Sequence, residues 1–323
     1  MCLIAFALSR HPRWPVVVLA NRDEWLGRPS AAAAWWPDRE GCFGGRDLEA
    51  GGSWMLLQRA GRLAMLTNDP RLAREPGQRS RGELVVALAN DPDPIEAAFA
   101  KLLDTDARYA GFQLLGIDWR EGEPRAMVAS NVPDTTGTSR PFSFAAGVHT
   151  LTNAPPDTPW RKALLLQGAL ADGLRNDGAL PVADWLATLS STQLPVHRGD
   201  VRSAGHVDDR TLPESAEARS PTPAGTVAAP GPARHKAAAD IRRVPDAFQL
   251  PEPAGALMSP FVAAAEPSGY GTRVSSIVTV ADDGLVRFDE WHWAAAASPP
   301  RWTRRIATRV GSPPAAASHA SPR

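Results

Sequence analysis

Cysteine is scarce in this chain, and long apolar runs are absent. Two cysteines, Cys2 and Cys42, are too few for a disulfide framework, which indicates a reducing compartment. No stretch approaches the roughly 20 apolar residues of a membrane-spanning helix. The apolar residues 1–8 lack a basic leader and end at Ser9-Arg10-His11-Pro12, so we expect no signal peptide. The sequence therefore predicts a soluble, cytoplasmic protein without a transmembrane segment.

An excess of either charge is also lacking. Lysine plus arginine and aspartate plus glutamate both total 35, so no net field would attract nucleic acid or an acidic membrane surface. We expect no nucleic-acid partner. The basic residues are mostly arginine, which together with the abundant alanine is typical of a GC-rich genome.

Several common functional motifs are missing. The chain has no G-x-G-x-x-G or G-x-x-x-x-G-K-[ST] phosphate loop, no H-E-x-x-H or C-x-x-C, and no G-x-S-x-G. The histidines are scattered singly, and neither His149 nor His292 belongs to a haem-ligand pattern. We therefore expect no metal and no organic cofactor.

Short apolar runs bounded by turn signals predict many strands, helical periodicity appears at 82–90 and 93–103, and two further helices fit the later sequence. The predicted strands are 2–8, 15–20, 53–58, 62–67, 111–118, 125–131, 145–152, 273–280 and 284–291. The predicted helices are 82–90, 93–103, 160–173 and 182–189. This order is typical of an α+β fold, and two antiparallel sheets stacked between helix layers would use every element. The final hairpin is expected to return to the first sheet.

One segment differs sharply in composition from the rest. Residues 196–245 are rich in Pro, Ala, Ser, Gly and charge, with few large apolar side chains to offset the entropy of ordering. We predict a single domain over 1–295, interrupted by a disordered insert at 196–245. The tail, 296–323, has a similar composition and is also predicted to be disordered.

Cys2 combines an unusual position with reactive chemistry. Its small side chain permits removal of Met1, which leaves a free α-amine on the residue that carries the thiol. Reference pKa values of about 7.7–8.0 for the amine and about 8.5 for the thiol let the amine act as the base for that thiol near neutral pH. One residue would then supply base and nucleophile. The alternative is that Cys2 is simply a buried strand residue.

A polar run, Asn21-Arg22-Asp23-Glu24, follows directly on strand 15–20. If that strand pairs antiparallel with 2–8, the run lies near Cys2. Arg22 would then hold a thiolate, and Asp23 would orient the α-ammonium or a water molecule. The alternative interpretation is a solvated turn.

Two predicted strands end in the same pattern. Leu66-Thr67-Asn68-Asp69-Pro70 and Leu151-Thr152-Asn153-Ala154-Pro155 both read L-T-N-x-P. An Asn side-chain amide at a strand end can donate to the oxyanion of a tetrahedral intermediate. Asn-x-Pro is also a routine way to end a strand, so both interpretations stay open.

A series of short motifs in this order resembles the NRDE family, the homologues of the transport and Golgi organisation protein 2. The motifs are Met1-Cys2, Ala20-Asn21-Arg22-Asp23-Glu24 with Arg28-Pro29, Gly51-Gly52-Ser53-Trp54, Leu66-Thr67-Asn68, Arg81-Gly82-Glu83-Leu84, Gly111-Phe112, Leu151-Thr152-Asn153, Thr158-Pro159-Trp160-Arg161-Lys162 and Tyr270-Gly271-Thr272-Arg273. The resemblance covers about residues 1–190 and 245–295, so nothing carries over to the insert or the tail.

More distantly, the Cys2 start and the two T-N positions resemble the choloylglycine hydrolases and penicillin V acylases. Those are N-terminal-nucleophile amidases of the αββα fold, so the resemblance implies an N-terminal-nucleophile-hydrolase-like αββα sandwich. The implied catalytic residues are Cys2, Arg22, Asp23, Asn68, Asn153 and Arg273. The amidases place Arg before Asn, with one residue ahead of Asp. Here the order is Asn21-Arg22-Asp23-Glu24, so the match is open by one residue. Asn21 or Glu24 is therefore an alternative to Arg22 or Asp23 in the catalytic role that the resemblance implies.

Two functions are compatible with these features. The first is a cysteine amidohydrolase that acts on a linear, non-peptide C–N amide, with an acyl amide as substrate. The second follows from the association of the NRDE family with Golgi organisation, lipid or acyl-CoA homeostasis and haem handling. This second function is the binding or trafficking of a small hydrophobic ligand without turnover. The sequence predicts neither the substrate nor the oligomeric state.

Overall fold

The computed structural model describes residues 3–104, 107–133, 141–175, 178–191, 260–261, 269–293 and 301–309, the last range mainly by its backbone. The predicted insert at 196–245 and the tail beyond residue 309 lie outside the described residues. So does Cys2. A separate unit, 196–249, also lies outside them, so the description below concerns the other unit of the chain.

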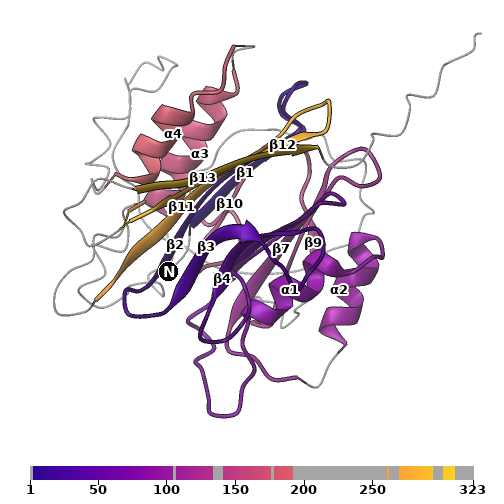
Figure 1. Ribbon diagram of the computed structural model, residues 1–323, viewed down its shortest axis with the longest axis vertical. Helices are drawn as coiled ribbons and strands as arrows, with labels where there is room; N and C mark the ends of the chain where they lie inside the picture. The colour runs from indigo at the N-terminus through magenta and orange to yellow at the C-terminus, as the bar shows by residue number, and fades with distance from the viewer. Residues whose placement is uncertain are drawn as a thin grey trace, which may run out of the picture. The chain divides into compact units, whose positions relative to one another are not determined.

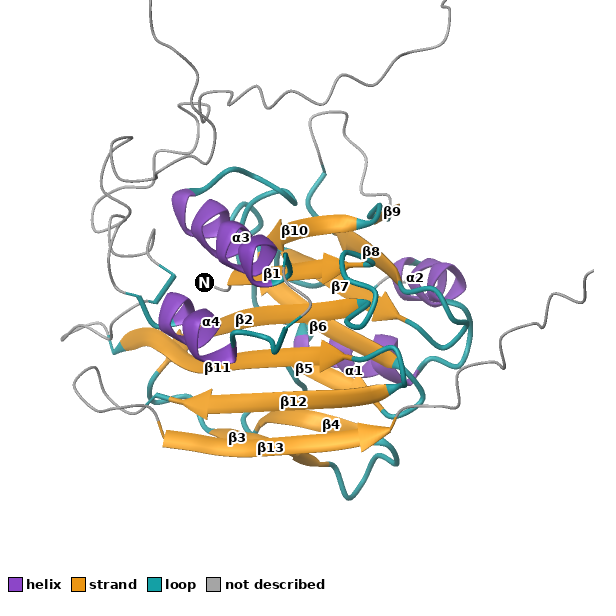
Figure 2. Ribbon diagram, turned by 90° about the horizontal axis from the view of Figure 1, so that it is seen from above, coloured by secondary structure: helices purple, strands orange, loops and turns teal. Residues whose placement is uncertain are grey.

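The first sheet (Figure 1) is antiparallel throughout, and Figure 2 shows its strands in the order β10-β1-β2-β11-β12-β13. Its strands are β1 (Leu3–Leu8), β2 (Val16–Trp25), β10 (Gly147–Leu151), β11 (Tyr270–Val280), β12 (Leu285–His292) and β13 (Arg301–Arg309). The predicted pairing of the first two strands is confirmed, because Leu8 lies opposite Val16 and Leu3 opposite Asn21. The final hairpin does return to this sheet, where β11 pairs with β2.

The second sheet is a sequential antiparallel meander of strands from β3 to β9. Its strands are β3 (Ser30–Trp35), β4 (Cys42–Asp47), β5 (Met55–Gln58), β6 (Arg62–Asn68), β7 (Phe112–Asp118), β8 (Arg125–Ser130) and β9 (Phe142–Ser143). Neither β3 nor β4 was predicted. Alanine dominates β3, and β4 contains Gly44 and Gly45, so each has only one aromatic and no β-branched residue to signal a strand. Pairing with neighbouring strands, which the local sequence does not reveal, makes both of them strands.

In the described part of the chain, four helices lie on the outer faces of the two sheets. They are α1 (Gly82–Asn90), α2 (Ile95–Leu103), α3 (Arg161–Gly173) and α4 (Val182–Leu189). Helices α1 and α2 pack against the second sheet, and α3 and α4 against the first, as Figures 1 and 2 show. This is a four-layer αββα arrangement, so the predicted α+β fold with two stacked antiparallel sheets is confirmed.

The main core lies between the two sheets and follows from strand alternation. Every second residue of β1, namely Ile4, Phe6 and Leu8, enters one apolar cluster with side chains of the second sheet such as Phe43 and Leu63. A second cluster, between the second sheet and α1 and α2, includes Leu88, Phe99 and Phe112. The αββα order thus gives each sheet two buried faces.

The prediction of a disordered tail from residue 296 is wrong for residues 301–309. These residues form β13, which pairs with β12 from Leu285–Arg309 to His292–Arg301. Their composition, Arg-Trp-Thr-Arg-Arg-Ile-Ala-Thr-Arg, is polar but includes β-branched and aromatic residues. An edge strand tolerates such charge and even benefits from it, because charged side chains discourage further pairing.

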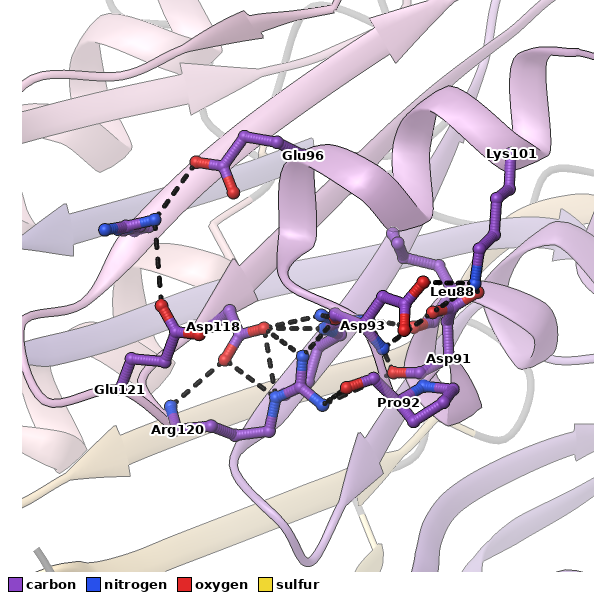
Figure 3. Close-up of polar contacts among 11 residues, drawn as sticks. Leu88, Asp91, Pro92, Asp93, Glu96, Lys101, Asp118, Arg120 and Glu121 are labelled. Carbon is purple, nitrogen blue, oxygen red and sulfur yellow. Dashed lines mark hydrogen bonds and ion pairs between the residues drawn. The ribbon is translucent and has the colours of Figure 1, made fainter.

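A buried polar cluster attaches the loop between α1 and α2 to the second sheet (Figure 3). The Arg62 side chain is fully buried. Its Nε donates to Asp118 Oδ2 at 2.8 Å, and its Nη1 donates to the carbonyls of Leu88 and Asp91 at 3.0 and 2.9 Å. Arg120 also donates to Asp118, and to the carbonyls of residues 91–93. The cluster satisfies carbonyls at the end of α1, so we assign it a structural role.

Candidate functional site

A cavity of about 280 Å³ lies at the end of β2. It is lined by the last residues of that strand, the β4–β5 connection, the end of β6 and a segment that leads into α1. The lining residues are Arg22, Asp23, Glu24, Trp25, Arg28, Asp47, Ser53, Trp54, Leu66, Asn68, Arg74, Arg79, Ser80, Arg81, Gly82, Ala110 and Tyr270. Three residues expected from the sequence, Arg22, Asp23 and Asn68, thus share one cavity.

Arg22 is 6% exposed and is held at the cavity wall by several contacts. Its guanidinium lies over the ring of Trp54, 4.2 Å from the ring centroid, and its Nη1 donates to Ser30 Oγ at 3.2 Å. Glu24 Oε2 lies 3.6 Å from its Nη2. The stacking and the ion pair keep a permanent positive charge in a nearly dry position, where it favours a neighbouring thiolate.

Asp23 is also buried, and its surroundings carry positive charge. Its Oδ1 accepts a 2.7 Å hydrogen bond from Thr272 Oγ1. Burial raises the pKa of Asp23, while the positive charges of the chain's amino terminus and of Lys162 and the hydrogen bond from Thr272 act in the opposite direction. A positively charged ammonium group next to Asp23 would therefore stabilise its buried carboxylate.

The two alternative site residues of the Asn21-Arg22-Asp23-Glu24 run, Asn21 and Glu24, differ in whether they line the cavity. Asn21 does not line the cavity, because its Nδ2 donates to the carbonyls of Leu189 and Pro260, at 2.8 Å each. Its Oδ1 accepts from Ser275 Oγ at 2.6 Å. Asn21 thus joins β2 to the end of α4. Glu24 does line the cavity, so the geometry favours Arg22, Asp23 and Glu24 over Asn21 as groups that meet a ligand.

The two L-T-N strand ends meet, although they belong to different sheets. Asn153 Nδ2 donates to the backbone carbonyl of Asn68 at 2.5 Å. Gln113 Nε2, from β7, donates to the carbonyls of Thr152 and Ala154 and holds the loop after β10 in place. Asn153 is 4% exposed, and among the described residues its Oδ1 has no hydrogen-bond partner.

Arg273 lies at a register shift between β11 and β2, and it does not line the cavity. Its Nη1 donates to the carbonyls of Arg28 and Trp25, at 2.5 and 3.2 Å. These carbonyls flank the turn between β2 and β3. In this structure Arg273 therefore stabilises the backbone just beyond the Arg22-Asp23-Glu24 run.

Two glycine-containing motifs shape the opposite side of the cavity. The α1 start approaches the 51–53 backbone so closely that a Cβ on Gly52 would lie 2.5 Å from the carbonyl carbon of Gly82. Ser53 N donates to the Gly82 carbonyl at 3.2 Å. This contact brings Trp54 and Arg81 to the same cavity, from motifs about 30 residues apart in the sequence.

Sequence reasoning missed Lys162 and Thr272 as members of the site. Lys162 is 1% exposed at the start of α3, with its Nζ 5.5 Å from the centroid of the Trp160 ring. The burial of Lys162 is a property of the folded structure that the sequence does not show. Thr272 gives no sequence signal either, because its partner Asp23 lies 249 positions away.

Cys42 and the two histidines of interest lie away from the cavity. Cys42 is buried, and burial raises the pKa of its thiol. His149 contacts Asp157 and the Ala145 carbonyl, and His292 contacts Glu290. Within the described ranges, no group of three or more His, Cys, Asp or Glu residues is arranged to hold a metal ion.

The fold and the site define an α+β protein of two stacked antiparallel sheets with a charged cavity at the end of β2. The chain belongs to the Transport and Golgi organisation 2 family, whose model matches residues 1–295. The resemblance to the NRDE family is thereby confirmed.

Curated relatives are similar over much of their length. The Transport and Golgi organization protein 2 homolog of Bos taurus is 29% identical over 319 residues, which cover 94% of this chain and 96% of that protein. The Homo sapiens homolog is 29% identical over 198 residues, covering 58% of this chain and 70% of that protein.

Two solved structures are similar at low sequence identity. A Caenorhabditis elegans ortholog of N-acylethanolamine-hydrolyzing acid amidase has a TM-score of 0.41 and 9% identity, covering 61% of this chain and 88% of that one. A mutant conjugated bile acid hydrolase from Clostridium perfringens has a TM-score of 0.40 and 12% identity, covering 96% and 92%. Separately, none of the helices in the described part of the chain is long and apolar enough to cross a membrane.

Proposed function

We propose that this protein is a cysteine amidohydrolase of the N-terminal-nucleophile type, acting on a linear, non-peptide C–N amide. The nucleophile is Cys2 after removal of Met1. The observation that carries the proposal is the register of β1 and β2, in which Leu3 lies opposite Asn21. If this pairing continues by one residue, Cys2 lies opposite Arg22, which lines the cavity.

The alternation of side chains along β1 and β2 also supports a location of Cys2 beside Arg22. Ile4, Phe6 and Leu8 of β1 point between the two sheets, as does Ala20 of β2. Cys2 and Arg22 have the same parity as these residues, so both would face the space between the sheets. A thiolate there would be close to the Arg22 guanidinium, which favours the charged form.

The proposed reaction begins with transfer of the Cys2 thiol proton to its own α-amine. The thiolate attacks the amide carbonyl carbon, and the tetrahedral oxyanion accepts hydrogen bonds from Asn68 and Asn153. Asn153 Nδ2 has a second N–H besides the one donated to the Asn68 carbonyl. The α-ammonium returns its proton to the leaving nitrogen as the C–N bond breaks, which leaves a thioester. Water, deprotonated by the α-amine, then hydrolyses the thioester to the acid and the free thiol.

The remaining site residues hold these groups in place. The buried carboxyl of Asp23 would accept a hydrogen bond from the α-ammonium of Cys2 that removal of Met1 leaves. Arg273 would act as a positioning residue, through the carbonyls of Trp25 and Arg28. No metal or organic cofactor takes part in this scheme.

The test is hydrolysis of a panel of short acyl amides and acyl thioesters by the purified full-length protein. We expect release of the free acid by the wild-type protein and its complete loss in Cys2→Ala. Cys42→Ala is the matched control and should retain the activity. Activity that survives in Cys2→Ala would remove the proposal.

The alternative function is ligand binding without turnover. The aromatic side chains of Trp25, Trp54 and Tyr270 line the cavity and favour some affinity for a ligand in either case. A ligand that copurifies with the protein, together with no hydrolysis of any compound in the panel, would support the carrier function.

A further inference from the structure

Gln113 is a polar side chain on the inner face of the second sheet. It lies on β7 with the same parity as Leu115 and Ile117, and both of these belong to the apolar cluster between the sheets. Its side chain is 1% exposed. A buried amide is unfavourable unless its donors are satisfied, so the hydrogen bonds of Gln113 determine whether a glutamine is tolerated there.

Both donors of Gln113 are directed at the loop after β10. Its Nε2 donates to the carbonyls of Thr152 and Ala154, at 3.1 and 2.6 Å. A glutamine amide has two N–H groups, so neither is left over for a ligand. The opposite orientation of the amide would place its oxygen against two carbonyl oxygens, so the same acceptors fix which way it lies. Gln113 therefore acts on the loop and not on a ligand.

The residue between these two carbonyls is Asn153. It is 4% exposed, and its Nδ2 donates across the space between the sheets to the carbonyl of Asn68. Because the carbonyls on both sides of Asn153 are held from β7, its backbone cannot shift without breaking a hydrogen bond from Gln113. The direction of the second N–H on Asn153 Nδ2 is fixed as a result.

The register of β1 relates Asn153 to the proposed nucleophile. Strand β1 lies between β10 and β2, and Ile4 lies opposite Leu151 of β10. If this pairing continues by two residues, Asn153 lies opposite Cys2, on the side away from Arg22. Leu151 belongs to the cluster between the sheets, and Asn153 has the same parity. The loop that Gln113 holds is therefore the one that would flank Cys2.

We propose that Gln113 is a positioning residue of the oxyanion site, which it serves by holding both carbonyls that flank Asn153. This rests on the proposed function, in which Asn153 donates to the tetrahedral oxyanion. Oxyanion donors must be in place before the reaction, and a displacement of about 1 Å can lower the rate by about 10²-fold. An interaction made only in the transition state changes kcat and leaves KM unchanged.

The first test replaces Gln113 by methionine, which keeps the length of the side chain and removes both N–H donors. The substrate is the acyl amide of the panel that the wild-type protein hydrolyses fastest. Gln113→Met should lower kcat by about 10–100-fold with KM nearly unchanged, measured on folded protein. If this variant does not fold, Gln113→Glu keeps the shape and has at most one donor when its buried carboxyl is neutral. Its kcat should also lie below that of the wild type.

Gln167 provides a matched control. Its Nε2 donates to the carbonyl of Val148, on the same strand β10, at 2.7 Å from α3. Gln167→Met therefore removes the same kind of hydrogen bond from the same strand, at the end away from Asn153. It should keep the wild-type kcat.

A double-mutant cycle separates positioning of Asn153 from any independent effect. If Gln113 acts through Asn153, Gln113→Met should have almost no further effect on kcat in protein that already carries Asn153→Ala. The positioning role would be overturned by an unchanged kcat in Gln113→Met, by an equal loss in Gln167→Met, or by a full loss that persists in the Asn153→Ala background.

Hydrogen exchange tests the contact without any catalysis. The backbone N–H of Ala154 donates to Thr152 Oγ1 at 3.2 Å, within the loop that Gln113 holds. Peptides covering residues 150–157 should exchange about tenfold faster in Gln113→Met, as the loss of one or two hydrogen bonds implies, and at the wild-type rate in Gln167→Met. Unchanged exchange in Gln113→Met would overturn the positioning role even if the wild-type protein is an amidohydrolase. Faster exchange in a protein that shows no Cys2-dependent hydrolysis would overturn the proposed function and retain the hold of Gln113 on Asn153.

Discussion

The side-chain amide of Asn153 donates a hydrogen bond to the backbone carbonyl of Asn68, and so joins the ends of two strands from different sheets. Asn68 ends β6 of the second sheet, and Asn153 follows β10 of the first. The two sheets therefore converge at the position where the proposed mechanism needs oxyanion donors.

Asn153→Ala should affect both stability and activity. It removes a buried donor and leaves the Asn68 carbonyl without that partner, which we expect to lower the free energy of unfolding by about 1–3 kcal/mol. Loss of an oxyanion donor should lower kcat by about 10²–10³-fold. Urea unfolding and initial rates on folded protein measure the two effects separately. An unchanged kcat would exclude Asn153 from the oxyanion site.

Arg62→Met should destabilise the fold without changing the chemistry. The substitution leaves Asp118 buried with one cationic partner fewer and removes the donor to the Leu88 and Asp91 carbonyls. We expect a loss of about 3–5 kcal/mol of unfolding free energy. The matched control, Arg125→Gln, should change it by less than about 0.5 kcal/mol. A destabilisation as small as that of the control would show that the cluster in Figure 3 is not structural.

Gly52→Ala should loosen the start of α1. A Cβ at this position would lie 2.5 Å from the Gly82 carbonyl carbon, so backbone must shift. We expect a cost of about 1–3 kcal/mol in unfolding free energy. Gly27→Ala is the control, because a Cβ there would meet nothing within 4 Å. Equal melting temperatures for the two variants would contradict the close contact.

The His149–Asp157 contact should make stability depend on pH. Burial lowers the pKa of His149, but hydrogen bonds with Asp157 and the Ala145 carbonyl outweigh it, so the pKa is raised above the ordinary value. A raised folded-state pKa stabilises the protein fully below the unfolded pKa, near 6.5, and the benefit is lost as pH rises through the folded value.

His149→Gln should therefore cost more stability at pH 5.5 than at pH 8.5. Urea unfolding of wild type and variant at both pH values measures the difference. A cost that is equal at the two pH values, or larger at pH 8.5, would show that the imidazolium is not the form that the fold favours.

The parts of the fold with a clear local pattern could be predicted from the sequence. Short apolar runs on either side of a turn signal predicted the hairpin of β1 and β2, and helical periodicity predicted α1 over residues 82–90. The Asn-x-Pro pattern marked the ends of β6 and β10 as related. Each of these signals lies within a few residues of the chain.

The rest depends on distant contacts that leave no local pattern. The alanines of β3 and the glycines of β4 become strands only through their neighbours, and β13 is a polar edge strand in a segment that composition alone assigns to disorder. Thr272 contacts Asp23 across 249 positions, and the two carbonyls to which Asn21 donates lie 168 and 239 positions away from it. Sequence reasoning identified the strand end, but not which of its side chains face the cavity.

Intact-mass analysis after brief alkylation at neutral pH tests the identity of the nucleophile most directly. We expect Met1 to be absent and a single adduct to form at Cys2. Cys42 should react much more slowly, because burial raises its thiol pKa. Arg22→Ala should slow labelling of Cys2 without unfolding the protein. Retention of Met1, acetylation of the Cys2 amine, or faster labelling of Cys42 than of Cys2 would contradict the proposed mechanism.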